Sequence, residues 1–215
     1  DIKANKIFSI LDQKINRGVG VARKEAIKIA KYDVIALMDS DDISLESRFE
    51  KQLKIISEAK AEVVGSWIEE FENIPNDLGS IRKLPTTHDE IYEFGKFRMP
   101  VNNVTLMFTK KAYMRAGGYS EQRNSEDWNL IARMLAKGII FHNIPEVLVY
   151  ARAGESMVTR RRSYSHFINE LKVFPKMYSL KYINLFHLIA NILIRIILRV
   201  LPQKLTSITY RKILR

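Results

Sequence analysis

The sequence has 215 residues, with 35 Lys and Arg against 24 Asp and Glu, and no cysteine, which excludes disulfide frameworks, thiolate metal sites and cysteine nucleophiles. Hydrophobic residues make up 47% of the chain, far too many for a disordered protein, and the length suits one domain with an appendage. The net charge of +11 comes from residues 151–215, because residues 1–150 hold 22 basic and 22 acidic side chains. We therefore expect a neutral globular body with a basic tail, not a fold with a basic nucleic-acid-binding face.

Strand and helix signals alternate along residues 1–150, as α/β layering requires. Apolar runs predict strands over 7–11, 34–38, 61–68, 104–108, 139–143 and 147–151. Amphipathic spacing predicts helices over 20–31, 44–59, 88–97 and 125–137, and in the tail over 164–176. In the second of these, the apolar side is formed by Leu45, Phe49, Leu53 and Ile56. Two prolines and a glycine predict a loop over 73–87.

An acidic cluster, Asp39-Ser40-Asp41-Asp42, follows the apolar run 34–38, which is typical of a strand buried on both faces of a parallel sheet. Open α/β sheets bind ligands at the carboxyl ends of such strands. Carboxylates this close repel one another unless a cation neutralises them, and hard divalent ions favour carboxylate oxygens. The structural alternative is a solvated turn in which Asp42 or Ser44 caps the next helix.

A second acidic pair, Glu126-Asp127, opens the predicted helix 125–137, with Trp128 next to it. A helix N-terminus favours the ionised carboxylate, so Asp127 could take a proton from a substrate hydroxyl. Trp128 could pack against a sugar ring or against the core. The structural alternative is a plain helix start, with Ser125 as the N-cap and acids that complement the helix dipole.

In chain order, five motifs together resemble the family 2 glycosyltransferases with the GT-A fold, a Rossmann-like α/β fold of nucleotide-diphospho-sugar transferases. They are Asn16-Arg17-Gly18, Ala22-Arg23, Asp39-Ser40-Asp41-Asp42, Gly117-Gly118-Tyr119 and Glu126-Asp127. The segments 98–100 and 105–108 look like the bacterial capsule, exopolysaccharide and O-antigen branch. The resemblance covers about residues 5–165.

The resemblance implies an inverting transferase that moves a sugar from a nucleotide-diphosphate sugar, most commonly a UDP-sugar, to a hydroxyl of a glycan acceptor that is often lipid-linked. By the match of motifs, Asp39 and Asp41 bind the donor with Mn²⁺ or Mg²⁺. Asp127 matches the catalytic base, and Glu126 is its neighbour.

Other positions have weaker implied roles. Asn16, Gly18 and Arg23 match the segment that lines the nucleotide pocket, and their structural alternative is a loop leading into a helix. Gly118 could let the backbone approach the bound sugar or could belong to a plain turn.

The polar connector after residue 151 carries three arginines at 160–162. Arg161 and Arg162 could close over the diphosphate, because guanidinium pairs bidentately with phosphate oxygens, or they could form a solvated or membrane-facing patch. His88 and His142 are expected to be structural.

The family's first two strands and their acidic turn have no counterpart here. By this resemblance we expect roughly the first 70–80 residues of a usual member to be absent, which would leave a sheet edge unpaired. We therefore expect an N-terminally incomplete catalytic domain over 1–158, and expect the isolated chain to be inactive.

Residues 159–215 are expected to form a basic helical tail. Within it, residues 183–201 predict an amphipathic helix whose polar side chains are Asn184, His187, Asn191, Arg195 and Arg199. Two arginines make spanning a bilayer marginal, so we expect this helix to lie on anionic lipid at the inner face of the bacterial cytoplasmic membrane. A helix docked on the catalytic domain or on a second subunit is the alternative.

Two other functions stay open on the sequence alone. The chain could be a non-catalytic fragment or scaffold of a glycan-assembly complex, or, less favoured, a basic protein that binds nucleic acid through its tail. Against nucleic-acid binding, the tail has no pattern of residues for stacking on bases or reading them, and its apolar run would be exposed to water.

Overall fold

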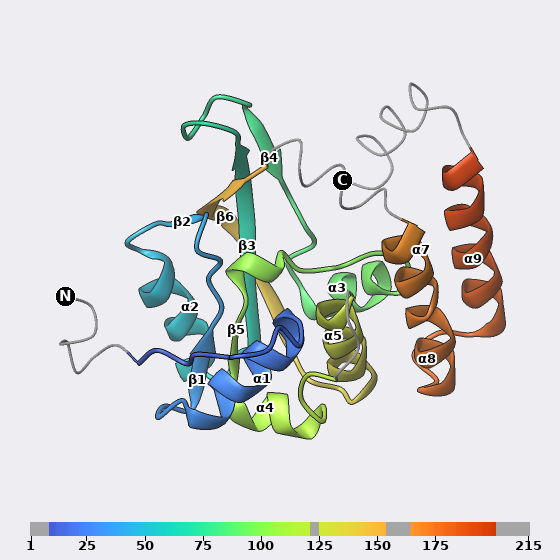
Figure 1. The fold of residues 1–215 in the computed structure, drawn as a ribbon, viewed down its shortest axis with the longest axis horizontal. Helices are drawn as coiled ribbons and strands as arrows, with labels where there is room; N and C mark the ends of the chain where they lie inside the picture. The colour runs from blue at the N-terminus through green and yellow to red at the C-terminus, as the bar shows by residue number, and fades with distance from the viewer. Residues whose placement is uncertain (1–8, 121–124, 154–163, 201–215) are drawn as a thin grey trace.

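A mixed six-stranded sheet forms the centre of the structure, a computed structural model that describes residues 9–120, 125–153 and 164–200. In this described part the strand order is β1-β5-β3-β6-β2, and β4 also pairs with β3 (Figure 1). Strands β3 and β6 are parallel, and the pairs β1–β5, β3–β5, β3–β4 and β2–β6 are antiparallel. The strands are β1 (Val34–Ala36), β2 (Ile43–Ser44), β3 (Val63–Phe71), β4 (Ser80–Arg82), β5 (Met107–Thr109) and β6 (Phe141–Arg152).

Helices lie on both faces of this sheet, because alternate side chains of β3 point to opposite faces. Val63 belongs to the large core cluster with α5, and Val64 belongs to a smaller cluster with Ile55 and Ile56 of α2. The helices are α1 (Val19–Ile29), α2 (Arg48–Ser57), α3 (His88–Gly95), α4 (Lys110–Arg115), α5 (Glu126–Ala136), α7 (Tyr164–Leu171), α8 (Val173–Ser179) and α9 (Leu185–Val200), with a 3₁₀ turn, η2 (Asn103–Thr105).

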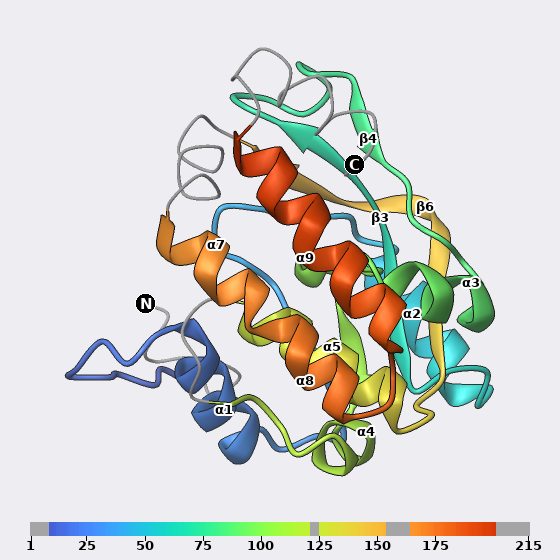
Figure 2. The same ribbon diagram turned by 90° about the vertical axis from the view of Figure 1, so that its right-hand side faces the viewer.

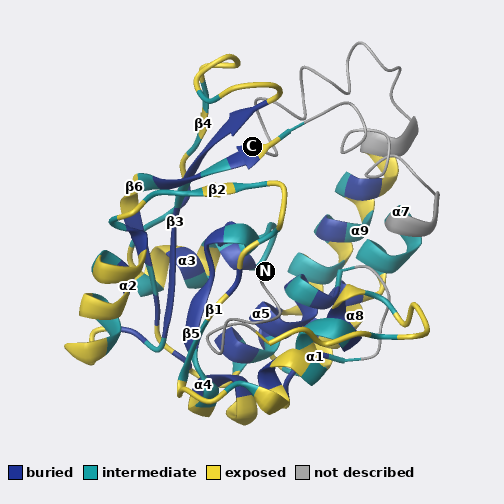
Figure 3. Ribbon diagram, turned by 60° about the vertical axis from the view of Figure 1, so that its left-hand side comes forward, coloured by how far each residue is buried: buried dark blue, intermediate teal, exposed yellow. Residues whose placement is uncertain are grey.

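Helices α7, α8 and α9 form a further layer outside α5 (Figure 2). Val173, Phe174 and Met177 of α8 are fully buried in the same core as α5, whose side chains are mostly buried (Figure 3). The described helices after residue 164 therefore share the core of the body. The domain boundary at residue 158 stays a prediction, because it lies outside the described residues.

The sequence predicts that the apolar run 34–38 is a strand buried within a parallel sheet, and this prediction is wrong. Strand β1 holds only three residues, pairs antiparallel with β5 at one end of the described strand order, and is partly exposed. A continuous apolar run does not encode the direction of its neighbour, and here the neighbour is antiparallel. Of the expected strand 7–11, residues 9–11 are exposed and outside any strand, and residues 7–8 lie outside the described residues.

Other predicted elements are confirmed with shifted bounds. The strands expected over 61–68 and 104–108 correspond to β3 and β5, and those over 139–143 and 147–151 merge into the single strand β6. The predicted loop contains β4, and α4 was not predicted. The helix expected over 164–176 is interrupted at Lys172, which separates α7 from α8.

Helix α2 turns a different face to the core from the one its apolar pattern predicted. Ser44 lies in β2, and the helix begins only at Arg48, so neither Ser44 nor Asp42 caps it. Its apolar Phe49 and Leu53 are exposed, whereas Arg48 and Gln52 are fully buried.

The buried pair Arg48 and Gln52 joins α2 to three segments of the sheet. Arg48 donates to the carbonyl of Leu37 at 2.8 Å and to Oε1 of Gln52 at 3.0 Å, and Gln52 donates to the carbonyls of Val64 and Thr105 at 3.0 and 2.7 Å. Burial lowers the pKa of Arg48 to about 10, against a smaller raising effect of Asp42. These bonds hold α2 against β3, against η2 and against Leu37, which lies two residues before the acidic turn.

We predict that replacing Gln52 with Met lowers the free energy of unfolding by about 2–4 kcal/mol, because two buried carbonyls lose their donor. Urea unfolding of the purified chain measures this loss. The control is Leu53→Gln on the exposed side of the same helix, which should change the value by less than about 0.5 kcal/mol. Equal effects of the two variants would contradict the role given to Gln52.

Candidate functional site

The candidate site begins at the loop that leads into α1. Asn16 accepts a hydrogen bond from the backbone N–H of Gly18 at 3.0 Å, through its side-chain oxygen. Gly18 has φ of 96° and ψ of 160°, a conformation that only glycine adopts without strain, and α1 starts directly after it. The sequence Asn16-Arg17-Gly18 therefore fixes how the chain enters α1.

Arg23, one turn into α1, connects this helix to the acidic turn. Its Nη2 donates to Oδ1 of Asp39 at 2.7 Å. With the Asn103 amide turned so that its oxygen faces the guanidinium, that oxygen accepts from Arg23 at 3.0 and 3.3 Å. Burial acts to lower the pKa of Arg23, but Tyr119, Asp39 and Asp127 outweigh it and raise the pKa. One guanidinium thus lies among groups from four separate segments.

The first turn of α5 brings the second acidic pair to the same place. A Cβ on Gly20 would lie 2.9 Å from Cγ of Glu126, so the two helices meet where α1 has no side chain. Glu126 is buried, and its pKa is raised by burial first and by Asp127 second. Asp127 accepts from the N–H of Trp128 at 2.7 Å. The structure therefore brings Asp39, Arg23, Glu126 and Asp127 together.

Ser125 stands at the N-cap position of α5, but its side chain makes no capping bond, which corrects the predicted cap. Its φ of 56° and ψ of 21° place it in the left-handed region. The helix start is instead fixed by the packing of Glu126 against Gly20.

The remaining acids of the acidic turn are held by the end of β6. Oδ1 of Asp42 accepts from the N–H of Arg152 at 2.8 Å, and the carbonyl of Asp41 accepts from Nε of Arg152 at 3.3 Å. Burial is the main reason that the pKa of Asp42 is raised. The side chain of Asp41 is exposed, so of the three acids it is the most accessible to a ligand.

The donors that a metal could use here are the carboxylates of Asp39 and Asp41. Among the described residues no group of three or more His, Cys, Asp or Glu side chains is arranged to hold a metal. Mg²⁺ is commonly bound by one or two carboxylates together with substrate phosphates and water. The exposed carboxylate of Asp41, beside that of Asp39, fits a metal whose coordination a substrate completes.

Two predicted contact residues, Trp128 and Gly118, have contacts within the protein. Trp128 is buried at 7% exposure and packs edge-on against Phe174 at 5.3 Å, so the core alternative is correct for its ring. Gly118, with φ of 67°, lies against the Tyr113 ring, and its carbonyl accepts from Arg133 at 2.5 Å. The close approach at Gly118 is therefore to Tyr113, because a Cβ there would lie 2.9 Å from that ring.

Asn103 and Arg152 were not singled out as site residues by the sequence, and Tyr119 was named only as part of the motif Gly117-Gly118-Tyr119. The signal for Asn103 is a pair of asparagines ahead of an apolar run, and that for Arg152 is a cation directly after the last strand. Arg161 and Arg162 lie outside the described residues. Nδ1 of His88 accepts from the N–H of Phe141 at 3.3 Å, which confirms its structural role.

The chain is similar to known proteins over most of its length. A protein-family model described as "Glycosyl transferase family 2" matches residues 2–121. An uncharacterized glycosyltransferase of Haemophilus influenzae is 35% identical over 93% of this chain and 74% of its own length. A UDP-Gal:alpha-D-GlcNAc-diphosphoundecaprenol beta-1,3-galactosyltransferase of Escherichia coli is 34% identical over 93% of this chain and 73% of its own length. The amylovoran biosynthesis glycosyltransferase AmsE of Erwinia amylovora is 32% identical over 92% of this chain and 74% of its own length.

Solved structures agree on the fold. A Pyrobaculum calidifontis mannosyltransferase in complex with GDP-Man and Mn²⁺ superposes with a TM-score of 0.58 at 14% identity, over 80% of this chain and 46% of that chain. TarS of S. aureus superposes with a TM-score of 0.56 at 14% identity, over 94% of this chain and 34% of that chain. The predicted GT-A fold is confirmed by these matches and by the family model.

We predict that Glu126→Gln stabilises the chain at pH 7. The folded-state pKa of Glu126 lies above its ordinary value of 4.5, so the folded state binds the proton more tightly than the unfolded state. The wild-type free energy of unfolding therefore falls as the pH rises through the folded-state pKa, and the neutral Gln avoids this loss. Urea unfolding from pH 4 to pH 8 should show the variant's advantage at pH 7 shrinking on acidification. The exposed Glu50→Gln should show no such trend, and a constant difference for Glu126→Gln would contradict the prediction.

Proposed function

Because the chain belongs to glycosyl transferase family 2, we propose that it transfers a sugar with inversion from a nucleotide-diphosphate sugar to a hydroxyl of a glycan acceptor in bacterial surface-polysaccharide synthesis. The observation that carries this proposal is the position of Arg23. Its guanidinium bonds to Asp39 of the acidic turn and interacts electrostatically with Asp127 of the second acidic pair. Two acidic motifs that lie 88 positions apart in the sequence are thus joined through one cation.

On the donor side, we assign nucleotide-diphosphate binding to the α1 entry and the acidic turn. Asn16 and Gly18 shape the loop ahead of α1, and Arg23 holds Asp39 in place. Asp39 and Asp41 would hold Mn²⁺ or Mg²⁺ together with the diphosphate oxygens. The ion, when bound, supplies a Lewis acid that offsets negative charge on the departing nucleoside diphosphate.

On the acceptor side, Asp127 is the proposed catalytic base. Its carboxylate accepts the proton of the acceptor hydroxyl while the hydroxyl oxygen forms a bond to the anomeric carbon. The bond between that carbon and the diphosphate oxygen breaks in the same displacement, and the bonding electrons leave with the nucleoside diphosphate. The first turn of a helix favours the ionised carboxylate that this step requires. Glu126 is buried, at 6% exposure, and is therefore less accessible to an acceptor hydroxyl.

We propose a UDP-sugar donor and a lipid-linked acceptor. The name of the E. coli relative gives it a UDP-sugar donor and an undecaprenol-diphosphate acceptor, at 34% identity over 93% of this chain. The name of another relative places it in amylovoran biosynthesis. The structural neighbour with GDP-Man and Mn²⁺ supports a metal-assisted nucleotide-sugar site in this fold.

We propose further that the protein is peripheral on the inner face of the cytoplasmic membrane, where such an acceptor is found. Support comes from the charge of residues 151–215, which hold 13 basic side chains against two acidic ones. Attraction to anionic lipid grows by about 1 kcal/mol for each such cation near the surface. Within the described helices, none is both long and apolar enough to cross a bilayer.

We predict that Asp127→Asn and Asp41→Asn differ in their effects on turnover and on UDP binding. Asp127→Asn should lower turnover about 10²–10⁴-fold, because the proton acceptor is lost, and should leave UDP affinity in the presence of Mn²⁺ nearly unchanged. Asp41→Asn should lower both the turnover and the affinity for UDP in the presence of Mn²⁺. Because the isolated chain is expected to be inactive, turnover is measured as sugar transfer from a panel of UDP-sugars by the chain extended with the family's first two strands. Calorimetric titration with UDP, with and without Mn²⁺, measures binding.

The matched control is Asp89→Asn in α3, which removes an exposed acid outside the site and should change neither quantity. UDP binding that is indifferent to both Mn²⁺ and Asp41→Asn would contradict the metal role. Unchanged turnover in Asp127→Asn would contradict the base. UDP binding without turnover in the extended wild type would favour the scaffold alternative.

A further inference from the structure

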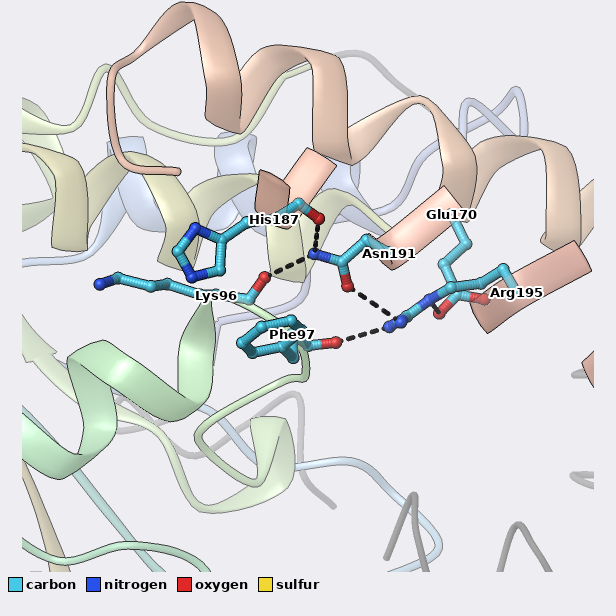
Figure 4. A network of polar contacts seen from close by, with 6 residues as sticks. All are labelled: Lys96, Phe97, Glu170, His187, Asn191 and Arg195. Carbon is cyan, nitrogen blue, oxygen red and sulfur yellow. Dashed lines mark hydrogen bonds and ion pairs between the residues drawn. The ribbon is translucent and has the colours of Figure 1, made fainter. Parts of the chain in front are cut away.

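Helix α9 is amphipathic, but its polar side faces the protein. Asn191 is fully buried and Arg195 nearly so, although they are polar residues in one of the most apolar helices of the described part (Figure 4). His187 also turns inward and lies edge-on to the Phe97 ring at 5.2 Å. An amphipathic helix on a water-soluble surface has the opposite arrangement, with its apolar side inward.

The polar side of α9 is bound to the end of α3. Asn191 donates to the carbonyl of Lys96 at 2.9 Å, and Arg195 donates to the carbonyl of Phe97 at 2.6 Å. Arg195 also bonds to Oδ1 of Asn191 at 3.0 Å and to Glu170 of α7 at 3.3 Å. The last carbonyls of a helix have no partner within it, so the end of α3 offers acceptors that α9 uses.

The same arginine links α9 to the candidate site. Its guanidinium lies 4.7 Å from the centre of the Phe174 ring and 5.5 Å from that of Trp128, the residue after Asp127. The orientation of α9 is therefore fixed by buried contacts on α3, α5, α7 and α8, and its outer face is equally fixed.

That outer face is a continuous apolar surface, here named the outward stripe. Its members share helical spacing and exposure: Leu185, Phe186, Ile189, Leu193, Ile196 and Ile197. At about 100° per residue they cluster on the side of the helix opposite Asn191 and Arg195. Phe186 is 71% exposed, more than most apolar side chains in the described residues. Exposed apolar surface of this extent marks an interaction site.

We propose that the outward stripe docks on an anionic lipid surface, with α9 lying flat on it. This inference rests on the membrane association proposed above and specifies the face that makes it. Exposed lysines of the same helical layer, Lys172, Lys176 and Lys181, carry the charge that anionic headgroups attract. The polar side of α9 is bound to protein through Asn191 and Arg195, so the outward stripe is the side of the helix that meets the lipid.

A second copy of the chain is a poorer occupant of the outward stripe. A second copy would bring the same exposed lysines, Lys172, Lys176 and Lys181, to the assembly, so that like charge is added to like charge. In the described residues from 164 onward the one acid is Glu170, and it is paired with Arg195. Charge complementarity therefore favours anionic headgroups over another copy of the same face.

The test is vesicle sedimentation of the 215-residue chain with phosphatidylcholine alone and with phosphatidylcholine mixed with phosphatidylglycerol. The variant Leu193→Glu/Ile197→Glu places two acids on the outward stripe and should weaken binding to the anionic vesicles by tenfold or more. The matched control, Leu53→Glu/Met114→Glu, adds the same two charges at exposed apolar positions of α2 and α4 and should weaken it less than threefold. Thermal unfolding checks that each variant is folded.

A second measurement does not depend on acidic substitutions. Because the chain has no cysteine, Phe186→Cys carries a single environment-sensitive fluorophore, and Met114→Cys is its control. We expect a blue shift on anionic vesicles for the label at position 186 only.

Absence of wild-type binding to anionic vesicles would overturn both the membrane association and this inference. Wild-type binding that persists in the Leu193→Glu/Ile197→Glu variant, without a blue shift at position 186, would overturn the inference alone. An equal loss of vesicle binding in the matched control would show that the added charge, and not the outward stripe, is responsible for the weaker binding. A wild-type dimer that the outward-stripe variant dissociates, with vesicle binding unchanged, would assign the face to a second copy instead.

Discussion

The burial of α5 is the constraint on which the candidate site depends. Most of its side chains are buried between the sheet and helices α8 and α9, so the helix cannot turn about its axis without exposing core. Its first turn is therefore fixed against α1, where Gly20 leaves room for Glu126. That close approach brings Arg23 within reach of both Asp39 and the first turn of α5. The site is thus a consequence of how two helices pack.

Three buried or half-buried arginines connect the ends of secondary-structure elements. Arg23 binds the acidic turn after β1, Arg48 binds the carbonyl of Leu37 in the same connection, and Arg195 binds the end of α3. A buried guanidinium is costly unless its donors are used, and carbonyls at the ends of helices and strands are the acceptors that lack partners. These contacts explain why so cationic a chain buries several of its charges.

The sequence predicted the two acidic motifs, but it did not predict what holds them. Its patterns identified Asp39 and Asp127 as candidates, since acids after a strand and at a helix start have a chemical meaning. Asn103 was missed, because a partner reached across the fold leaves no local pattern. The inner face of α2 was assigned to Phe49 and Leu53, whereas Arg48 and Gln52 occupy it. Apolar spacing predicts burial only where the neighbouring surface is apolar, and here that surface presents carbonyls.

The sequence by itself determined the family through the order of its motifs, the alternation of strands and helices, and an amphipathic helix near residues 183–201. Only the tertiary structure decided the direction of the strand beside β1 and which side of α9 faces inward. A helix's own residues specify two unlike faces but not their neighbours. The carbonyls at the end of α3 accept hydrogen bonds from the polar face of α9, so that face lies inward. The apolar face is left exposed, because a buried hydrogen-bond acceptor without a donor costs more free energy than an exposed apolar side chain.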